Sequence, residues 1–159
     1  DEGLLACVKT PGGHRRYRLA DVLAMHQTTE GTPPITLQER LATLSRDSLD
    51  ALPHGVIQVA DDGSVLQYNA TESRFSGLTE KEVLGKHFFG EVAPCTNNSM
   101  VYGRFLEGVQ RGELDVRLFY TFSYRLELIN VILRLYRDHR TATNWVIIET
   151  GNQIATLIR

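Results

Sequence analysis

Cys95 is one of only two cysteines in the chain, and it lies in the stretch VAPCTNNSMVYGRF, residues 92–105. It follows Pro94 and precedes a segment whose pattern predicts a helix. Backbone N–H groups at a helix start favour a thiolate, and a thiolate can form a thioester with an activated acyl donor. A lone cysteine can equally be a small buried hydrophobic residue. Cys95 is therefore a candidate attachment point, whereas Cys7, in a strand-like run, is interpreted as packing.

Tyr68 and Glu72, four residues apart in YNATE, form a second group with potential chemistry. Side chains at i and i+4 can share one helix face. Taken singly, Tyr68 could be a core aromatic residue and Glu72 a solvated position. His54, His87 and His139 are scattered without the spacing of metal ligands, so no metal site is predicted.

Basic side chains gather near the N-terminus. Lys9, Arg15, Arg16 and Arg18 fall within ten residues that contain no acid. Such a cluster can be a solvated loop, or it can contact the phosphates of nucleic acid. The sequence PGG, residues 11–13, stands between LLACV and RYRL, which is typical of a hairpin loop between two short strands.

Length and composition are those of one globular domain with a small extra element. The 159 residues are 42% hydrophobic and 23% charged, with a net charge of -2. No apolar run approaches the roughly 18 residues that span a bilayer, no signal peptide opens the chain, and two cysteines make no disulfide framework. We expect a cytoplasmic protein with no membrane partner. Because the chain begins with Asp1 rather than Met, we expect a fragment of a longer protein.

The first 53 residues predict small elements. Residues 19–26 have the spacing of a short amphipathic helix, and residues 28–34, TTEGTPP, have the composition of a linker. Thr36 and Glu39 have capping-box spacing, so a helix is expected to run from there to Pro53. Its leucine stripe could connect domains, pair with a second copy, or pack on the next domain.

From residue 54 the pattern predicts two strands, several short helices and three longer strands. GVIQVA and SVLQY flank the DDG of residues 61–63, a strong hairpin signal. Helices are expected to end at Gly77, Gly85 and Gly112, and strands to cover residues 116–124, 129–135 and 144–149. This order predicts an α+β fold, an antiparallel sheet with helices on one face that can enclose a ligand.

Residues 50–149 resemble the photoactive yellow protein family of PAS-fold blue-light receptors. The shared segments, in the family's order and spacing, are GVIQV, LQYNATE, GKHFFGEVAPCT, YGRFLEGVQRGEL, YTFSY and NWVII. The resemblance implies a p-coumaric acid chromophore held on Cys95 as a 4-hydroxycinnamyl thioester. It also implies six chromophore-binding residues: Tyr68, Glu72, Ser76, Phe88, Tyr120 and Phe122.

In that family the tyrosine and the glutamate hydrogen-bond the phenolate end of the chromophore, and Ser76 stands where a threonine supports the tyrosine. Leu78 replaces an arginine that covers the pocket, which affects solvent access and colour. Leu126 replaces a methionine associated with fast dark recovery, so the resemblance implies a slower return.

The implied site is chemically self-consistent. A buried phenolate is costly without partners, and charge-assisted hydrogen bonds to it are strong. Tyr68 can donate one, and Glu72 can donate another if burial and the neighbouring negative charge keep its carboxyl protonated. Light would pull the phenolate from these donors, and Glu72 could pass on its proton. The buried carboxylate left behind would then drive rearrangement of the domain.

Residues 1–27 resemble the wing and following helix of a MerR-type winged helix, through EGLL, TPGGHRRYR and LADVL. The preceding helix-turn-helix is absent, so the resemblance implies binding of DNA through a longer natural chain that forms a homodimer. The implied DNA backbone contacts are Lys9, His14, Arg15, Arg16, Tyr17 and Arg18.

The predicted organisation is a partial winged-helix element in residues 1–27, a linker and connecting helix in residues 28–53, a PAS domain in residues 54–149 and a tail in residues 150–159. The predicted function is a light-sensing module of a DNA-binding transcriptional regulator, not an enzyme. Two alternatives remain: a PAS sensor whose Cys95 carries another acyl group or senses oxidation, and a cysteine acyltransferase. The acyltransferase would need a base beside the thiol, for which His87 is a weak candidate.

Overall fold

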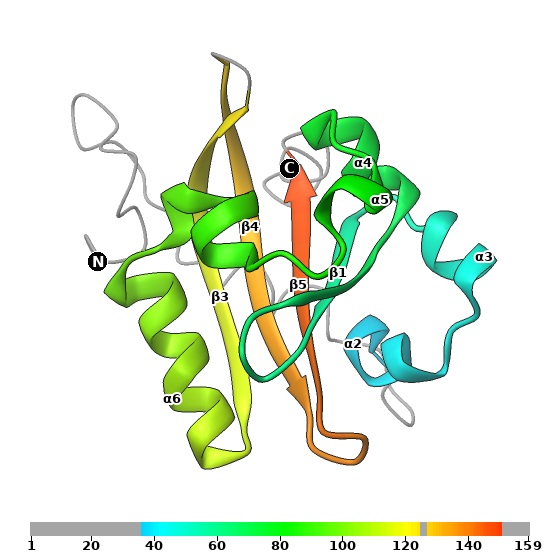
Figure 1. Cartoon of the computed structure of the whole chain (residues 1–159). Coiled ribbons are helices and arrows are strands. Elements are labelled where there is room, and N and C mark those ends of the chain that lie inside the picture. The colour runs from blue at the N-terminus through cyan, green and yellow to red at the C-terminus, as the bar shows by residue number, and fades with distance from the viewer. Residues whose placement is uncertain (1–35, 125–126, 151–159) are drawn as a thin grey trace, which may run out of the picture.

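A five-stranded antiparallel sheet organises the protein (Figure 1). The computed structural model describes residues 36–124 and 127–150. The strands follow the order β2-β1-β5-β4-β3 and are β1 (Gly55–Val59), β2 (Val65–Tyr68), β3 (Leu114–Tyr124), β4 (Glu127–Asp138) and β5 (Thr143–Thr150). The predicted α+β fold with a PAS-like antiparallel sheet is thereby confirmed. Several predicted features lie outside the described residues: the partial winged-helix element of residues 1–27, the linker of residues 28–34, Leu126, and the tail of residues 150–159 apart from its first residue.

Alternation along the strands gives the sheet two apolar faces. On β5, Val146 and Ile148 belong to one hydrophobic core, whereas Trp145 and Ile147 belong to the other. Successive side chains of a strand point to opposite faces, so the two cores lie on opposite sides of one sheet.

Short helices cover the first face. They are α4 (Ala70–Ser76), α5 (Glu80–Val83), η3 (Phe88–Val92), η4 (Pro94–Thr96), η5 (Ser99–Gly103) and α6 (Arg104–Arg111). Of these, η3 and η5 are π-helical and η4 is a 3-10 turn. In the part of the chain that the structure describes, no helix has the length and apolar character that a membrane crossing requires.

The helix boundaries follow the capping signals of the sequence. The Thr79–Glu82 capping box is formed at the start of α5. Gly77 and Gly112 end α4 and α6 with φ of 75° and 78°, the left-handed conformation that glycine adopts without a Cβ clash. The helix that was expected to end at Gly112 is formed as η5 followed directly by α6.

The segment before β1 differs from the single helix that was predicted. It forms α2 (Leu37–Arg40), η2 (Leu41–Thr43) and α3 (Arg46–Asp50). Leu44 is extended, and Ser45 starts a new helix by accepting a hydrogen bond from the Ser48 N–H. A side-chain cap inside the segment therefore competes with continuation of one helix.

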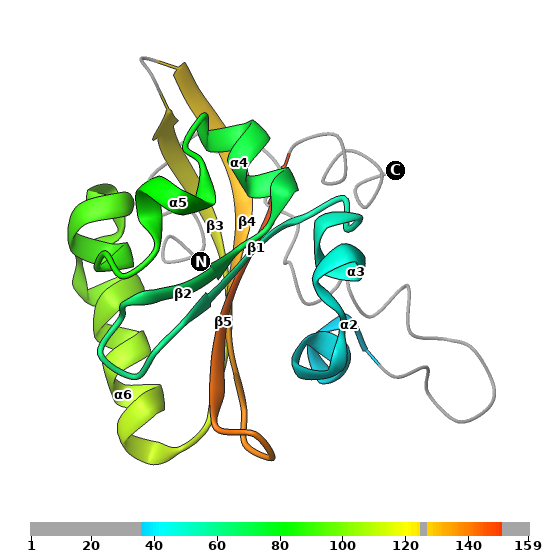
Figure 2. The ribbon, with the colours of Figure 1, turned by 45° about the vertical axis from the view of Figure 1, so that its right-hand side comes forward.

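These N-terminal helices pack on the second face of the sheet, opposite α4, α5 and α6 (Figure 2). Leu41 and Leu49 join Trp145, Val56 and Ile147 in the core there. Helices therefore cover both faces, not one. Of the three uses considered for the leucine stripe, packing on the next domain is the one that this structure shows.

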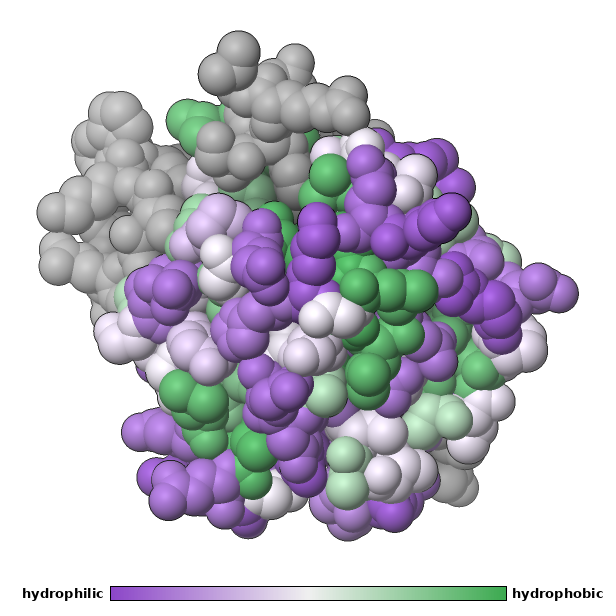
Figure 3. Space-filling model, in the orientation of Figure 1, coloured by the Kyte–Doolittle hydropathy of each residue, from purple (hydrophilic) through white to green (hydrophobic). Residues whose placement is uncertain are grey.

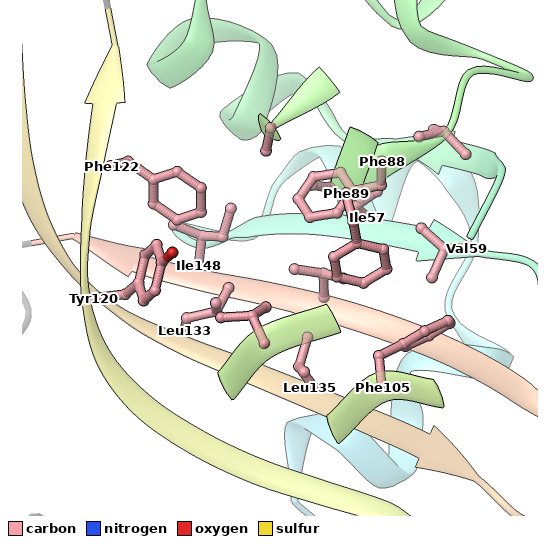
Figure 4. Packing of buried hydrophobic residues seen from close by; sticks show 14 of the residues in the cluster. Ile57, Val59, Phe88, Phe89, Phe105, Tyr120, Phe122, Leu133, Leu135 and Ile148 are labelled. Carbon is pink, nitrogen blue, oxygen red and sulfur yellow. The ribbon is translucent and has the colours of Figure 1, made fainter. Parts of the chain in front are cut away.

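The core of the first face is rich in aromatic residues, and Figure 4 shows its packing. Phe88 and Phe89 meet edge to face with centroids 5.1 Å apart, and Phe89 stacks on Tyr102 at 4.8 Å. Tyr120 and Phe122 extend from β3 into this core. Close packing restricts the movement of these aromatic rings, so this side of the sheet is rigid.

Candidate functional site

The junction between β2 and α4 carries three of the candidate residues. Tyr68 ends β2, Asn69 caps α4 by accepting the Glu72 N–H, and Ser76 is the last residue of α4. Tyr68 and Glu72 are each 1% exposed and Ser76 is 7% exposed. Tyr68 lies on β2, so the expectation that Tyr68 and Glu72 share one helix face is wrong. The turn from β2 into α4 instead brings the phenol beside the carboxyl and the hydroxyl on the buried side of α4.

A short hydrogen-bond chain joins these three side chains. The Tyr68 hydroxyl donates to Ser76 Oγ at 2.7 Å and lies 3.5 Å from Glu72 Oε1. Ser76 Oγ donates to the backbone oxygen of Glu72 at 2.9 Å and accepts the Leu78 N–H at 3.1 Å. The hydrogen bond from Tyr68 to Ser76 is shorter than the one to Glu72, so it is the stronger of the two and fixes the orientation of the phenol.

Burial and the neighbouring Glu72 carboxyl raise the pKa of Tyr68 above its ordinary value. The phenol is therefore neutral across the physiological range. It keeps its proton and acts as a hydrogen-bond donor.

Gly55 makes room for the Glu72 carboxyl. A Cβ built on Gly55 would collide with Glu72 Oε2 and would also crowd the rest of that side chain. Gly55 is the first residue of β1, so the carboxyl lies against the start of a sheet strand. Sequence patterns did not reveal this contact, because it joins residues that are far apart along the chain.

Cys95 lies in the 3-10 turn η4 and is exposed. Its backbone oxygen accepts a hydrogen bond from the Tyr120 hydroxyl at 2.5 Å and another from Asn98 Nδ2 at 3.1 Å. Asn98 Nδ2 also donates to the Tyr120 hydroxyl at 2.8 Å, and Asn98 Oδ1 caps η5. The turn that carries the thiol is thus tied to β3.

A cavity of about 380 Å³ connects the thiol with the buried polar group. Its lining residues are Tyr68, Glu72, Ser76, Leu78, Phe88, Val92, Ala93, Pro94, Cys95 and Phe122. The volume lies within the roughly 300–1,000 Å³ usual for small-molecule sites. Apolar walls with a few polar groups and one thiol suit a small aromatic acyl group with a polar end.

Most of the sequence-predicted residues meet in this cavity. Five of the six predicted chromophore-binding residues and the predicted attachment residue line it. The sixth, Tyr120, is 3% exposed and contacts the Cys95 backbone instead of lining the cavity. Val92, Ala93 and Pro94 were not predicted as lining residues, although their position beside Cys95 was a usable signal.

The remaining candidate residues lie elsewhere. His87 is a half-buried residue whose Nδ1 accepts the Gly90 N–H and whose ring meets Tyr102 edge to face, and it does not line the cavity. The six predicted DNA-contacting residues, Lys9, His14, Arg15, Arg16, Tyr17 and Arg18, lie outside the described residues. Within residues 36–124 and 127–150, no cluster of three histidine, cysteine or acidic side chains could hold a metal ion.

The surface over this region is mixed in polarity. Figure 3 shows hydrophobic side chains gathered near the middle of the face that carries α4 and α5, within a largely hydrophilic surround. The large hydrophobic residues that the described surface exposes are Leu66, Leu84, Leu106 and Leu128. None of them lines the cavity.

Comparison with known proteins identifies similar sequences and structures. The family model of the PAS fold matches residues 46–141. Over 113 residues the chain is 36% identical to photoactive yellow protein from Halochromatium salexigens and 32% identical to that from Rhodothalassium salexigens; each alignment covers 71% of this chain and 90% of the relative. A crystal structure of the photoactive yellow protein domain from the sensor histidine kinase Ppr of Rhodospirillum centenum has a TM-score of 0.68 and 36% identity, covering 72% of this chain and 100% of that chain.

Proposed function

Since this chain belongs to the photoactive yellow protein family within the PAS fold, we propose that it is a light sensor that holds a p-coumaroyl group on Cys95 as a thioester. One observation carries the proposal. Cys95 lines the same 380 Å³ cavity as the buried Tyr68–Glu72–Ser76 group. When bound, the p-coumaroyl group supplies absorption of blue light and isomerisation of a double bond.

Loading needs only the thiol and an activated acyl donor. The Cys95 Sγ thiolate attacks the donor's carbonyl carbon, an S–C bond forms, and the bond to the leaving group breaks with its electron pair on that group. The exposure of Cys95 gives the donor access. Hydrogen bonds from Tyr120 and Asn98 to the Cys95 backbone oxygen keep the turn in place.

Tyr68 and Glu72 hold the phenolate end in the proposed complex. Tyr68 is a neutral donor because burial raises its pKa. Glu72, at 1% exposure, keeps its carboxyl proton in preference to a buried charge, so it is a second donor. Two donors, one from the end of β2 and one from α4, replace the water that a phenolate would otherwise bind.

The response to light follows from the cost of a buried charge. After illumination Glu72 would pass its carboxyl proton to the phenolate oxygen, and a carboxylate would be left in a place shielded from water. A buried charge that no opposite charge compensates is strongly destabilising. The domain then rearranges around α4, which carries Glu72 and contacts β1.

At Leu78 the cavity of this chain differs from the pattern of the family. Leu78 lines the cavity where the family carries an arginine, so the entrance has an apolar cover instead of a charged one.

We further propose that residues 1–27 contribute to binding of DNA in a longer dimeric chain, which makes the light response a signal for transcription. The basic residues near Arg15 support this second proposal.

The two alternatives differ in what they require near Cys95. A cysteine acyltransferase needs a base beside the thiol, and no histidine is among the described residues that line the cavity. A sensor of another acyl group or of oxidation needs only an accessible thiol, yet it gives no role to the buried Tyr68 and Glu72. The paired donors therefore favour the p-coumaroyl sensor.

Incubation with activated p-coumaric acid tests the proposal. The protein should gain one p-coumaroyl group by intact mass and a visible absorption band. Cys95→Ala should lose both, and Cys7→Ala should keep both, because Cys95 is the cysteine that lines the cavity in the part of the chain that the structure describes. Labelling that persists in Cys95→Ala would contradict the attachment. Repeated turnover of the thioester would favour the acyltransferase.

A further inference from the structure

Three charged side chains hold the backbone where β2 passes into α4. Glu80 Oε2 accepts the Tyr68 N–H at 3.0 Å, and Arg46 Nη2 donates to the Tyr68 backbone oxygen at 3.3 Å. Asp50 Oδ1 accepts the Ala70 N–H at 2.8 Å. We call Arg46, Asp50 and Glu80 the charged clamp. None of its members was singled out from the sequence.

Ion pairs join the clamp into one unit. Arg46 Nη1 lies 2.5 Å from Glu80 Oε2, and Arg46 Nε lies 3.1 Å from Asp50 Oδ2. An exposed ion pair alone contributes little to stability. Here, however, each carboxylate also accepts a backbone N–H, and charge-assisted hydrogen bonds of this kind are stronger and more directional than neutral ones. The clamp also connects α3 with α5, which are distant in sequence.

The clamp fixes one end of Tyr68, and Ser76 fixes the other. The backbone on both sides of the Tyr68 Cα is held by Glu80 and Arg46, while the phenol donates to Ser76 Oγ at 2.7 Å. The phenol oxygen lies on the Cβ–Cγ axis, so its position depends on χ1, which prefers discrete staggered rotamers, and not on rotation about χ2. A shift of the backbone would therefore move the hydroxyl directly.

We propose that Arg46 and Glu80 are positioning residues for the Tyr68 phenol, so that they set where this donor meets the p-coumaroyl group. This inference rests on the proposed function of the cavity. A purely structural role is the competing explanation, in which the clamp only anchors α3 beside the sheet. The two differ in whether the phenol itself moves when the clamp is opened.

The unloaded 159-residue chain, labelled for NMR, gives the first test. In Glu80→Ala the Tyr68 amide should exchange roughly tenfold faster, and the Tyr68 Cζ resonance should move because its hydrogen bond to Ser76 changes. Glu80→Gln retains an acceptor oxygen and should restore part of both signals. Asp115→Asn is the matched control, because it removes a carboxylate from the Arg134–Asp115 pair at 2.7 Å, which does not touch Tyr68. A Tyr68 Cζ resonance that stays in place in Glu80→Ala would overturn the proposal.

The loaded protein gives the second test. The absorption band should shift in Glu80→Ala, shift less in Glu80→Gln, and stay in place in Asp115→Asn. A band that stays in place in Glu80→Ala while the Cζ resonance moves would overturn the link between the clamp and the chromophore. If the wild type accepts no p-coumaroyl group at all, the proposed function fails, and the NMR measurement still decides whether the clamp positions the phenol.

Discussion

At the scale of single residues, Glu72 places an ionisable carboxyl in a buried position. Its carboxyl is almost fully buried, lies 3.5 Å from the Tyr68 hydroxyl, and lines a cavity with an exposed thiol in its wall. A protonated carboxyl is tolerable in such a place, whereas an ionised one is costly. The same side chain can therefore hold a ligand in one protonation state and strain the fold in the other.

We expect Glu72→Gln to shift the absorption band of the loaded protein to longer wavelength. The amide is a weaker acid than a carboxyl, so the phenolate is held less tightly and its charge is freer to delocalise. The large structural response to light should also shrink, because no buried carboxylate can form. Absorption and infrared difference spectroscopy measure the two effects.

The infrared experiment can contradict the proposed role of Glu72. The wild type should lose a protonated-carboxyl C=O band on illumination, and Glu72→Gln should lack that band. If the wild type has no such band, or the mutant retains it, Glu72 is not the proton donor. The switching mechanism proposed for Glu72 would then be wrong.

Gly55 gives a prediction that needs no chromophore. Gly55→Ala adds a methyl group where Glu72 Oε2 lies, so the carboxyl or the strand must move, at a cost of about 1–3 kcal/mol. Gly103→Ala is the control, since its Cβ would meet its nearest neighbour at an ordinary 3.6 Å. Urea denaturation of the unloaded proteins should separate the two variants, and equal stabilities would contradict the close contact at Gly55.

At the scale of elements, the helices before β1 are part of the folded unit because they complete the second core. Leu41 is 1% exposed and packs with Leu49 and Trp145. Arg140 Nη2 adds a polar tie to the same region by donating to the backbone oxygen of Glu39 at 2.7 Å. The helices are thus held by apolar packing and by hydrogen bonds to the β4–β5 hairpin.

Leu41→Ala should lower the free energy of unfolding by about 2–5 kcal/mol, because it leaves a cavity in the second core. Leu106→Ala, at a position that is 45% exposed on α6, should change it by less than about 0.5 kcal/mol. Denaturant titration with a shared m-value compares them. If Leu41→Ala lowers the free energy of unfolding as little as Leu106→Ala does, the N-terminal helices contribute little to the stability of the fold.

At the scale of the whole molecule, the basic residues of the N-terminal region lead to a prediction about DNA binding. We expect residues 1–159 to bind duplex DNA weakly and without sequence preference, with affinity that falls as salt rises. Replacing Arg15 and Arg16 with alanine should lessen the salt dependence, because fewer phosphates are neutralised. Fluorescence anisotropy across a salt series measures this. Tight, sequence-specific binding by these residues alone would contradict the prediction.

Local signals in the sequence predicted the strands and several helix ends from β1 onward. Period-two alternation predicted the long strands, and the DDG turn predicted the first hairpin. Capping residues and glycines marked the helix ends, because these features act within a few residues of each other. Family resemblance supplied Cys95, Tyr68, Glu72 and Ser76 as a candidate set. The spacing of Tyr68 and Glu72 suggested a shared helix face, but Tyr68 lies on β2, and the spacing could not indicate the cavity that joins these residues.

Only the tertiary structure decided which distant groups meet. The break at Leu44, the second core around Trp145, the place of the Glu72 carboxyl against Gly55 and the charged clamp on Tyr68 all depend on contacts between separate elements. A charged residue such as Arg46 has no local pattern that names its partner. Its ion pairs are set by how α3 and α5 approach the end of β2, and that approach is determined by the packing of the whole sheet and not by the residues beside it.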